Sequence, residues 1–261
     1  MILCLLVIYF RVSYQSFLEL RFIAERIKNR IVTSLTLSKA SWTPKLIETI
    51  PGKRFLVLAP HPDDDAIGCG GTISKLVESQ KEVRICYLSI QSVEGIRESE
   101  RMNEIENSLK EMGVSDYKFL AKKFPSLDDV SRIIIKEISN YEPHAVFVPS
   151  PVENNDVHLK TFYSYLRSAK TAGNLRFDWL TVLYEIWNPL IPNVVIDITR
   201  YMPQKIQAIE AHKSQLAHLD FTRLAKGLNC YRSATVSMNG YAEAFILLPR
   251  GDFVRLFMKR G

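Results

Sequence analysis

The sequence predicts an α/β protein, a three-layer sandwich in which helices cover both faces of a mainly parallel sheet. Apolar runs typical of buried strands, such as residues 55–59 and 145–149, alternate with stretches of helical periodicity, such as residues 97–112. This alternation is typical of parallel sheets that are covered on both faces. We therefore expect the doubly wound strand order 3-2-1-4-5, in which the first and fourth strands are neighbours.

The expected elements follow one another without an internal repeat. Strands are predicted at residues 55–59, 83–88, 117–120, 145–149, 181–187, 194–198 and 241–248. Helices are predicted after the glycine cluster at residues 68–71, through about residue 80, and at residues 97–112, 127–140, 159–172 and 203–219. Gly113 is placed to end the second helix. Residues 43–53 contain two prolines and a glycine and indicate a connection into the main domain.

Size and composition indicate one globular domain with an N-terminal appendage. The chain has 261 residues, of which 47% are apolar and 24% charged, as in soluble proteins with a sizeable core. The net charge of +6 is spread along the chain without a long basic run, which argues against nucleic acid as a partner. The four cysteines lie far apart with no CxxC pair, a pattern typical of reduced thiols and a cytoplasmic location.

We divide the chain into an apolar and amphipathic segment, residues 1–45, and a main domain, residues 46–261. Residues 1–10 are apolar but fall short of the roughly 20 needed to span a bilayer, and nothing around them indicates a cleaved signal peptide. Residues 11–32 have the spacing of an amphipathic helix. Three roles stay open: packing on this domain or a partner subunit, peripheral membrane contact through residues 1–32, or an anchor.

The strongest chemical signal is the run from His61 to Asp65, HPDDD, directly after the first predicted strand. Three carboxylates and an imidazole this close together need water or a cation to compensate them. His61 and Asp64 can point the same way, and His158, in the loop after the fourth strand, can complete a three-ligand site. Two histidines and one carboxylate suit Zn²⁺ and equally Fe²⁺. Asp63 points elsewhere and is free to act as a general base.

These residues and several later stretches resemble the PIG-L/LmbE-like N-acetylglucosaminyl deacetylases. The similarity begins with LVLAPHPDD at residues 56–64 and GCGGTI at residues 68–73. It continues in shorter matches at Gly95-Ile96-Arg97-x-x-Glu100, Trp187-Asn188-Pro189, residues 195–199, His212-Lys213-Ser214-Gln215 and residues 241–245. The resemblance covers residues 54–215 and implies a Rossmann-like fold, in agreement with the strand and helix pattern.

The resemblance also implies an activity and a set of site residues. It implies a zinc-dependent hydrolase that uses metal-activated water to remove the acetyl group from an N-acetylglucosamine-type sugar or glycoconjugate. The metal ligands would be His61, Asp64 and His158, and Asp63 would be the catalytic base. Substrate-binding roles would fall to Arg97, Asn155 and His212.

Two positions depart from the family pattern. Asp65 stands where a glutamate is usual. Asn155 stands where the second motif, usually of the His-Pro-Asp-His type, has its first histidine, so an amide replaces an imidazole as donor to the reacting acetamide. Two alternatives therefore stay open. One is a non-catalytic glycan-binding relative with a degraded site, and the other is a different metal-dependent amidohydrolase or an Fe²⁺ enzyme on the same ligands.

Ordinary structural roles also stay open for some of these residues. Arg97 has the sequence context of a solvated charge at a helix start, paired with Glu100. His212 falls on a predicted helix, where a hydrogen-bonded structural histidine is common. His144 is the rival third ligand, but it precedes the fourth strand and should lie at the opposite edge of the sheet. The glycine cluster lacks the GxGxxG spacing of a dinucleotide site.

Overall fold

A computed structural model describes residues 43–89, 97–120 and 126–258. The described strands are β1 (Lys45–Ile47), β2 (Arg54–Ala59), β3 (Glu82–Tyr87), β4 (Asp116–Phe119), β5 (Ala145–Pro149), β6 (Leu180–Tyr184), β7 (Val194–Asp197) and β8 (Ala242–Pro249). The described helices are α2 (Asp64–Glu78), α3 (Glu98–Glu111), α4 (Leu127–Tyr141), α5 (Asp156–Thr171), α6 (Met202–Ala211), α7 (Lys213–Leu216), α8 (Phe221–Ala234) and α9 (Arg250–Met258), with 3-10 turns η1 (Ala172–Asn174) and η2 (Thr199–Tyr201).

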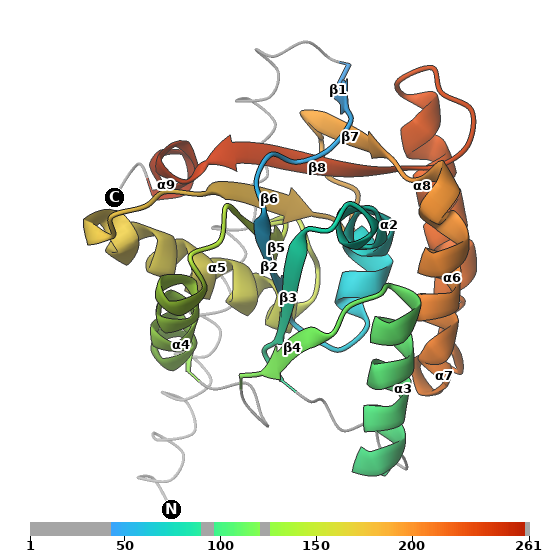
Figure 1. Cartoon of the computed structure of the whole chain (residues 1–261), viewed down its shortest axis with the longest axis horizontal. Helices are drawn as coiled ribbons and strands as arrows, with labels where there is room; N and C mark the ends of the chain where they lie inside the picture. Colours follow the sequence, from blue (N-terminus) through green and yellow to red (C-terminus); the bar gives the residue numbers. More distant parts are fainter. Residues whose placement is uncertain (1–42, 90–96, 121–125, 259–261) are drawn as a thin grey trace, which may run out of the picture.

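The described strands form one sheet in the order β1-β7-β8-β6-β5-β2-β3-β4 (Figure 1). The predicted first to fifth strands are β2, β3, β4, β5 and β6, so their order in the sheet is the expected 3-2-1-4-5. Within this group of five, every pair of neighbouring strands is parallel. The exception to the parallel arrangement is β8, which runs antiparallel to both β6 and β7. The prediction of an α/β fold with a mainly parallel sheet is confirmed.

Two layers of helices enclose this sheet. Figure 1 shows α2, α3 and α6 on one face and α4, α5 and α9 on the other. Residues along β2 alternate between the two apolar cores: Phe55 and Val57 join the core under α2, and Leu56 and Leu58 join the core under α4 and α5. A central strand that is buried on both faces needs this unbroken apolar run, which is why the sequence predicts it well.

Helix α2 begins earlier than predicted. The sequence suggested a loop through the glycine cluster, but the helix already starts at Asp64 and contains the glycines. A Cβ atom on Gly68 would lie 2.4 Å from the ring of Tyr184, and one on Gly71 would lie 2.7 Å from Ile198. The glycines therefore let the helix pack close against the sheet, where larger residues would push it away from the end of β2.

A break inside α2 is held by a buried ion pair. Cys69 leaves the helical conformation, and the backbone N–H groups of Gly71 and Thr72 donate to the Glu243 carboxylate at 2.9 and 2.7 Å. Lys205 on α6 completes the arrangement with its Nζ 2.6 Å from Glu243. Both of these charged side chains are buried, so each depends on the other for compensation.

Several predictions about element bounds are wrong. Residues 43–53 contain the edge strand β1, which pairs with β7. The predicted strand 181–187 ends at Tyr184. Beyond it, the backbone N–H groups of Ile186 and Trp187 turn to donate to the Glu153 carboxylate. The predicted helix 203–219 breaks at His212, where the backbone ψ angle of 60° leaves the helical range. Helices α8 and α9 were not predicted.

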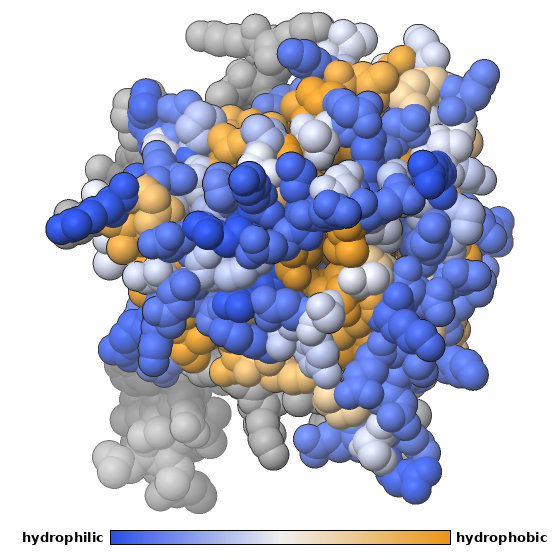
Figure 2. All heavy atoms as spheres, in the orientation of Figure 1, coloured by the Kyte–Doolittle hydropathy of each residue, from blue (hydrophilic) through white to orange (hydrophobic). Residues whose placement is uncertain are grey.

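The face of the molecule drawn in Figure 2 is mostly hydrophilic. Figure 2 shows polar residues covering the outer helices α3 and α6, with hydrophobic residues in view near β1 and β7. Among the described helices, none is both long enough and apolar enough to cross a bilayer. The predicted N-terminal segment and its proposed membrane contact lie outside the described residues.

Candidate active site

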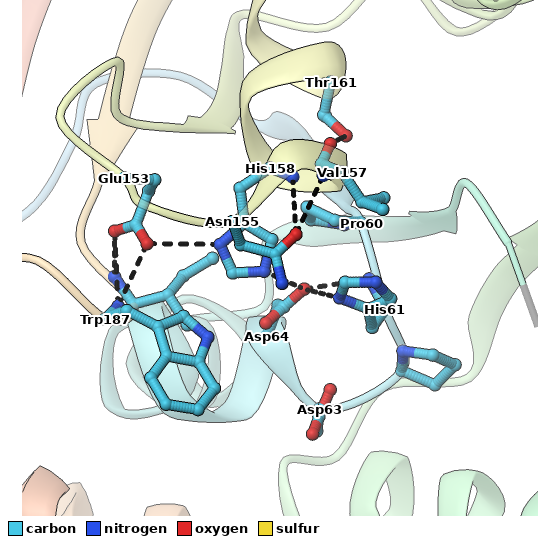
Figure 3. Close-up of polar contacts among 12 residues, drawn as sticks. Pro60, His61, Asp63, Asp64, Glu153, Asn155, Val157, His158, Thr161 and Trp187 are labelled. Carbon is cyan, nitrogen blue, oxygen red and sulfur yellow. Dashed lines mark hydrogen bonds and ion pairs between the residues drawn. The ribbon is translucent and has the colours of Figure 1, made fainter. Parts of the chain in front are cut away.

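Two loops meet at the carboxyl ends of the adjacent parallel strands β2 and β5 (Figure 3). The first loop carries His61 and leads through Asp63 into α2, whose first residue is Asp64. The second loop leads from β5 to α5 and carries Asn155 and His158 at the start of that helix. Since β2 and β5 are neighbours, side chains almost 100 residues apart in the sequence share one pocket.

The three predicted metal ligands converge on a small volume. The ligand atoms of His61, Asp64 and His158 all lie within 4.8 Å of one another. The Asp64 Oδ2 atom is 3.1 Å from Nδ1 of His61 and 3.3 Å from Nε2 of His158. Nε2 of His158 is completely buried and, among the described residues, has no hydrogen-bond partner of good geometry. A buried nitrogen that faces another ligand in this way fits a divalent cation between them.

Glu153 holds His158 in this orientation. The sequence did not predict Glu153 as a site residue. Its Oε2 is 3.2 Å from Nδ1 of His158, so that the other ring nitrogen faces Asp64. The same carboxylate accepts hydrogen bonds from the backbone N–H groups of Ile186 at 2.9 Å and Trp187 at 3.2 Å. These bonds end β6 early, and Figure 3 shows them on the side of Glu153 away from the ligands. A carboxylate behind a ligating histidine is a common feature of metal sites.

The charges of the group call for a cation. Burial acts to raise the pKa of Asp64, but the two histidines outweigh it and leave this pKa well below its usual range. Burial acts to lower the pKa of His158, yet Asp64 and Glu153 raise it to about 10. The carboxylates therefore draw a positive charge into the site, as a proton on His158 when no metal is bound. A divalent cation held by two imidazoles and a carboxylate supplies that charge more directly.

Asp63 lies beside the ligand group without belonging to it. It occupies the position before α2, but its side chain makes no capping hydrogen bond. Burial and the neighbouring Asp64 raise its pKa to about 6, and the positive charge of Arg101 partly offsets them. A carboxylate whose pKa lies this close to neutral pH can take and return a proton.

Asp65, at the position where the resemblance implies a glutamate, stands outside the three-ligand group and receives a hydrogen bond of 3.0 Å from the Tyr87 hydroxyl. It is fully buried, and burial raises its pKa to about 7. This contact gives Asp65 a place in the packing beneath the site.

Arg101, one turn into α3, is the buried arginine of the site. Its Nη2 donates to the Pro62 carbonyl at 3.1 Å and lies 4.0 Å from Oδ1 of Asp63. Its Nη1 donates to Glu104 at 3.0 Å and to Nδ1 of His212 at 3.1 Å. One guanidinium thus ties the HPDD loop to α3 and to the break between α6 and α7. Arg101 was not predicted from the sequence; the available clue was helical spacing, since Arg101 follows Arg97 by about one turn.

The structure places the predicted substrate residues differently. His212 is buried beside Arg101, and burial followed by the Arg101 charge lowers its pKa to about 3. Arg97 has a side chain 79% exposed, in an ion pair with Glu100, so among the described residues it stands outside the pocket lining. The substrate roles of Arg97 and His212 stay predictions. His144 lies at the opposite edge of the sheet, beside Arg54 at the start of β2.

Asn155 caps α5 and lines the pocket. Its Oδ1 accepts hydrogen bonds from the backbone N–H groups of Val157 at 2.8 Å and His158 at 3.4 Å. The cap fixes the orientation of the amide, so Nδ2 is the end that can donate to a ligand. The pocket has a volume of about 110 Å³, below that of typical small-molecule sites. Its lining residues are His61, Asp63, Asp64, Ile67, Arg101, Asn155, Trp187, Gln215 and Phe221.

Comparison with known proteins agrees with this geometry. The family model PIG-L, described as GlcNAc-PI de-N-acetylase, matches residues 56–169, which include both loops of the site. This match supports the resemblance of the chain to the PIG-L/LmbE-like family. A curated relative, the diacetylchitobiose deacetylase of Thermococcus kodakarensis, is 28% identical over 188 residues, which are 62% of this chain and 70% of the relative.

Solved structures share the fold of this chain. The N,N'-diacetylchitobiose deacetylase of Pyrococcus horikoshii has a TM-score of 0.67 at 24% identity, covering 77% of this chain and 85% of its own. GalB of Pseudomonas putida KT2440, a 4-carboxy-2-hydroxymuconate hydratase, has a TM-score of 0.64 at 18% identity, covering 76% of this chain and 96% of its own. The fold thus carries more than one reaction, and function has to be argued from the site.

Proposed function

We propose that the chain is a zinc-dependent N-deacetylase that hydrolyses the acetamide of an N-acetylglucosamine-type sugar or glycoconjugate. The observation that carries the proposal is the buried convergence of His61, Asp64 and His158 beside a separate carboxylate, Asp63. Hydrolysis of an amide needs a Lewis acid and a base in this relation. The relatives named as deacetylases support the choice of an N-acetylated sugar as substrate.

The metal ion would be held by His61, Asp64 and His158. When bound, it supplies Lewis acidity, which polarises the acetamide carbonyl and makes water a better nucleophile. Glu153 keeps the His158 ring turned toward the ligand group. The set of two histidines and one carboxylate favours Zn²⁺ for hydrolysis and also admits Fe²⁺.

Asp63 moves the protons of the reaction. Its carboxylate takes a proton from the attacking water as the new C–O bond forms, and it returns this proton to the amide nitrogen as the C–N bond breaks. The products are a free amine and acetate. A pKa raised to about 6 by burial and by Asp64 suits both steps near neutral pH.

Asn155 stabilises the charge that develops on the acyl oxygen. Because its Oδ1 caps α5, its Nδ2 group is held for donation into the pocket. An amide in this position performs the task of an oxyanion donor without titrating. The departure of Asn155 from the family histidine is thus compatible with activity.

Amine release from a panel of N-acetylglucosamine conjugates, with Zn²⁺ added, tests the proposal. Asp63→Asn should lower turnover by roughly 10²- to 10⁴-fold while metal content stays at the wild-type level. His158→Ala should lose the metal. Asp128→Asn, which changes an exposed carboxylate on α4, serves as the matched control and should leave both unchanged.

Two outcomes would contradict this function. Absence of turnover on every conjugate, with metal bound stoichiometrically, would favour the glycan-binding alternative. Normal metal binding by His158→Ala would show that the two loops do not form the metal site. Metal analysis of protein purified without oxygen decides between zinc and iron.

A further inference from the structure

We propose that the indole of Trp187 is the platform on which the pyranose ring of the substrate lies, so that this residue determines preference for a cyclic sugar over other N-acetyl compounds. The proposal rests on the proposed deacetylase function, which it deepens by assigning the sugar-binding wall of the pocket. Trp187 has no part in holding the metal or moving protons.

Trp187 is unusually exposed for a tryptophan in a pocket. Its relative exposure is 44%, although tryptophan is highly buried on average. Its ring meets that of Phe221 at a centroid distance of 5.4 Å and an interplanar angle of 82°. In an edge-to-face pair, one ring offers only its edge, so Phe221 covers at most one face of the indole. At least one flat face is therefore left for a ligand in the pocket that Trp187 lines.

The composition of the pocket matches a flat ligand with a polar rim. The polar lining side chains Asp63, Arg101, Asn155 and Gln215 can bond hydroxyl and amide groups. Trp187 and Phe221 instead form an apolar wall. A pyranose ring carries its hydroxyl groups around its rim and presents C–H groups on its faces. This chemistry suits a pocket in which polar groups and an aromatic face meet.

The backbone of Trp187 is tied to the reacting centre by one carboxylate. Glu153 accepts hydrogen bonds from the N–H of Trp187 at 3.3 Å through Oε1 and at 3.2 Å through Oε2, and the same group binds His158 at 3.2 Å. Figure 3 shows the indole on the opposite side of Asp64 from His61. The buried Glu153 carboxylate therefore fixes the distance between Trp187 and His158. A sugar that lies on the indole needs this fixed distance if its acetamide is to reach the metal site.

Calorimetric titration of the zinc-loaded full chain tests the platform directly. The Asp63→Asn background prevents turnover during the measurement. The probes are N-acetylglucosamine and the ringless N-acetylethanolamine, which carries the same acetamide. In this background we expect Trp187→Leu, which keeps apolar bulk but loses the flat ring, to weaken sugar binding about tenfold. Trp187→Phe, which keeps a flat ring, should stay within about threefold, and binding of the ringless probe should change little in both.

Tyr231→Leu is the matched control, because Tyr231 is an exposed aromatic residue, 58% accessible, outside the pocket lining. It should leave the Kd for N-acetylglucosamine unchanged. In the active background, Trp187→Leu should raise KM for the sugar with a smaller change in kcat, whereas a structural role would lower kcat for every substrate. Thermal unfolding of each variant checks that the chain is folded.

The proposal is overturned if Trp187→Leu binds the sugar as well as Trp187→Phe, if the ringless probe loses as much affinity as the sugar, or if the Asp63→Asn protein binds no sugar. A failure of the proposed deacetylase function can be told apart from a failure of the platform. Sugar binding that depends on Trp187 in a protein that releases no amine would keep the platform and reject the deacetylase. Amine release that is insensitive to Trp187 would keep the deacetylase and reject the platform.

Discussion

The two sides of the pocket differ in how their buried charged groups are compensated. On the ligand side, formed by the loops after β2 and β5, the atoms of His61, Asp64 and His158 face one another, and the buried Nε2 of His158 has no good partner within the described chain. On the helix side, formed by α3 and the break between α6 and α7, Arg101 already donates to three acceptors, and His212 beside it stays neutral.

The contrast indicates which side depends on an added ion. The ligand side gathers carboxylates and raises the pKa of His158 to about 10, so its charges are balanced only by a proton or a cation. The helix side balances its own charge with groups of the chain. We infer that the ligand side is assembled for binding and that the helix side is a rigid support for the Asp63 loop. The predictions below test this division, from the largest expected effect to the smallest.

Glu153→Gln should lower metal affinity by roughly 10- to 100-fold, because it removes the charge that orients His158. The variant keeps the size of the side chain and an oxygen that can still accept a hydrogen bond. Competition with a chromogenic chelator measures the change. Glu137→Gln is the matched control, since Glu137 is another buried glutamate in an ion pair, with Arg84 near the β4 edge. It should lose stability but not metal affinity. Equal metal loss in both variants would mean that general destabilisation is responsible.

Arg101→Lys should lower kcat by roughly tenfold to a hundredfold while the metal stays bound. Lysine keeps the charge but cannot reach the Pro62 carbonyl, Glu104 and His212 together, so the Asp63 loop loses its fixed position. Steady-state kinetics with parallel metal analysis gives the result.

Arg84→Lys is the control for Arg101→Lys, because Arg84 also makes several ion pairs but lies near the β4 edge of the sheet. It should destabilise the fold without a specific effect on kcat. Wild-type turnover in Arg101→Lys would show that the helix side does not position the base.

Arg97→Ala should raise KM about threefold and leave kcat unchanged if Arg97 binds the substrate at the rim, as the family resemblance implies. An exposed charge makes only a small, salt-sensitive contribution, so the effect should shrink at high ionic strength. Arg200→Ala is the control, because Arg200 is also exposed and paired with a glutamate, Glu78. Identical KM values for the two variants would assign Arg97 to the surface alone.

Much of the fold could be predicted, because its central strands are buried on both faces and read as unbroken apolar runs. The strand β8 was found, but its antiparallel direction was not, since direction leaves no mark on an apolar pattern. The edge strand β1 has three mostly exposed residues and gave no apolar signal. The start of α2 was misplaced because glycine normally disfavours helices, whereas here Gly68 and Gly71 permit close packing.

The sequence predicted the residues on the ligand side of the site, but it did not predict Glu153 and Arg101, which hold them in place. His61, Asp63 and Asp64 form a dense polar run, and strand order brings His158 to the same edge. Glu153 and Arg101 gave no separate signal, because their role depends on which backbone groups and rings surround them in three dimensions. The clue for Arg101 was its position one helical turn after Arg97. The clue for Glu153 was its place in the second loop.

The helix side makes a prediction about acid stability that a single substitution can isolate. The pKa of His212 is lowered from its ordinary 6.5 to about 3, first by burial and then by the charge of Arg101. Between these values the unfolded chain binds a proton that the folded chain does not, so stability is lost as pH falls below 6.5. Metal-free protein should therefore lose about 1 kcal/mol of its free energy of unfolding between pH 6 and pH 5 from this residue.

His212→Gln should remove that pH-dependent loss, because the glutamine oxygen accepts a hydrogen bond from Arg101 but takes no proton. Urea unfolding at pH 7, 6 and 5 measures the effect as a difference in slope between the variant and the wild type. His218→Gln, which changes an exposed histidine on the same stretch of chain, should keep the wild-type slope. A constant difference between His212→Gln and wild type across this pH range would mean that His212 takes up a proton in the folded state, and the helix side would then not balance its own charge.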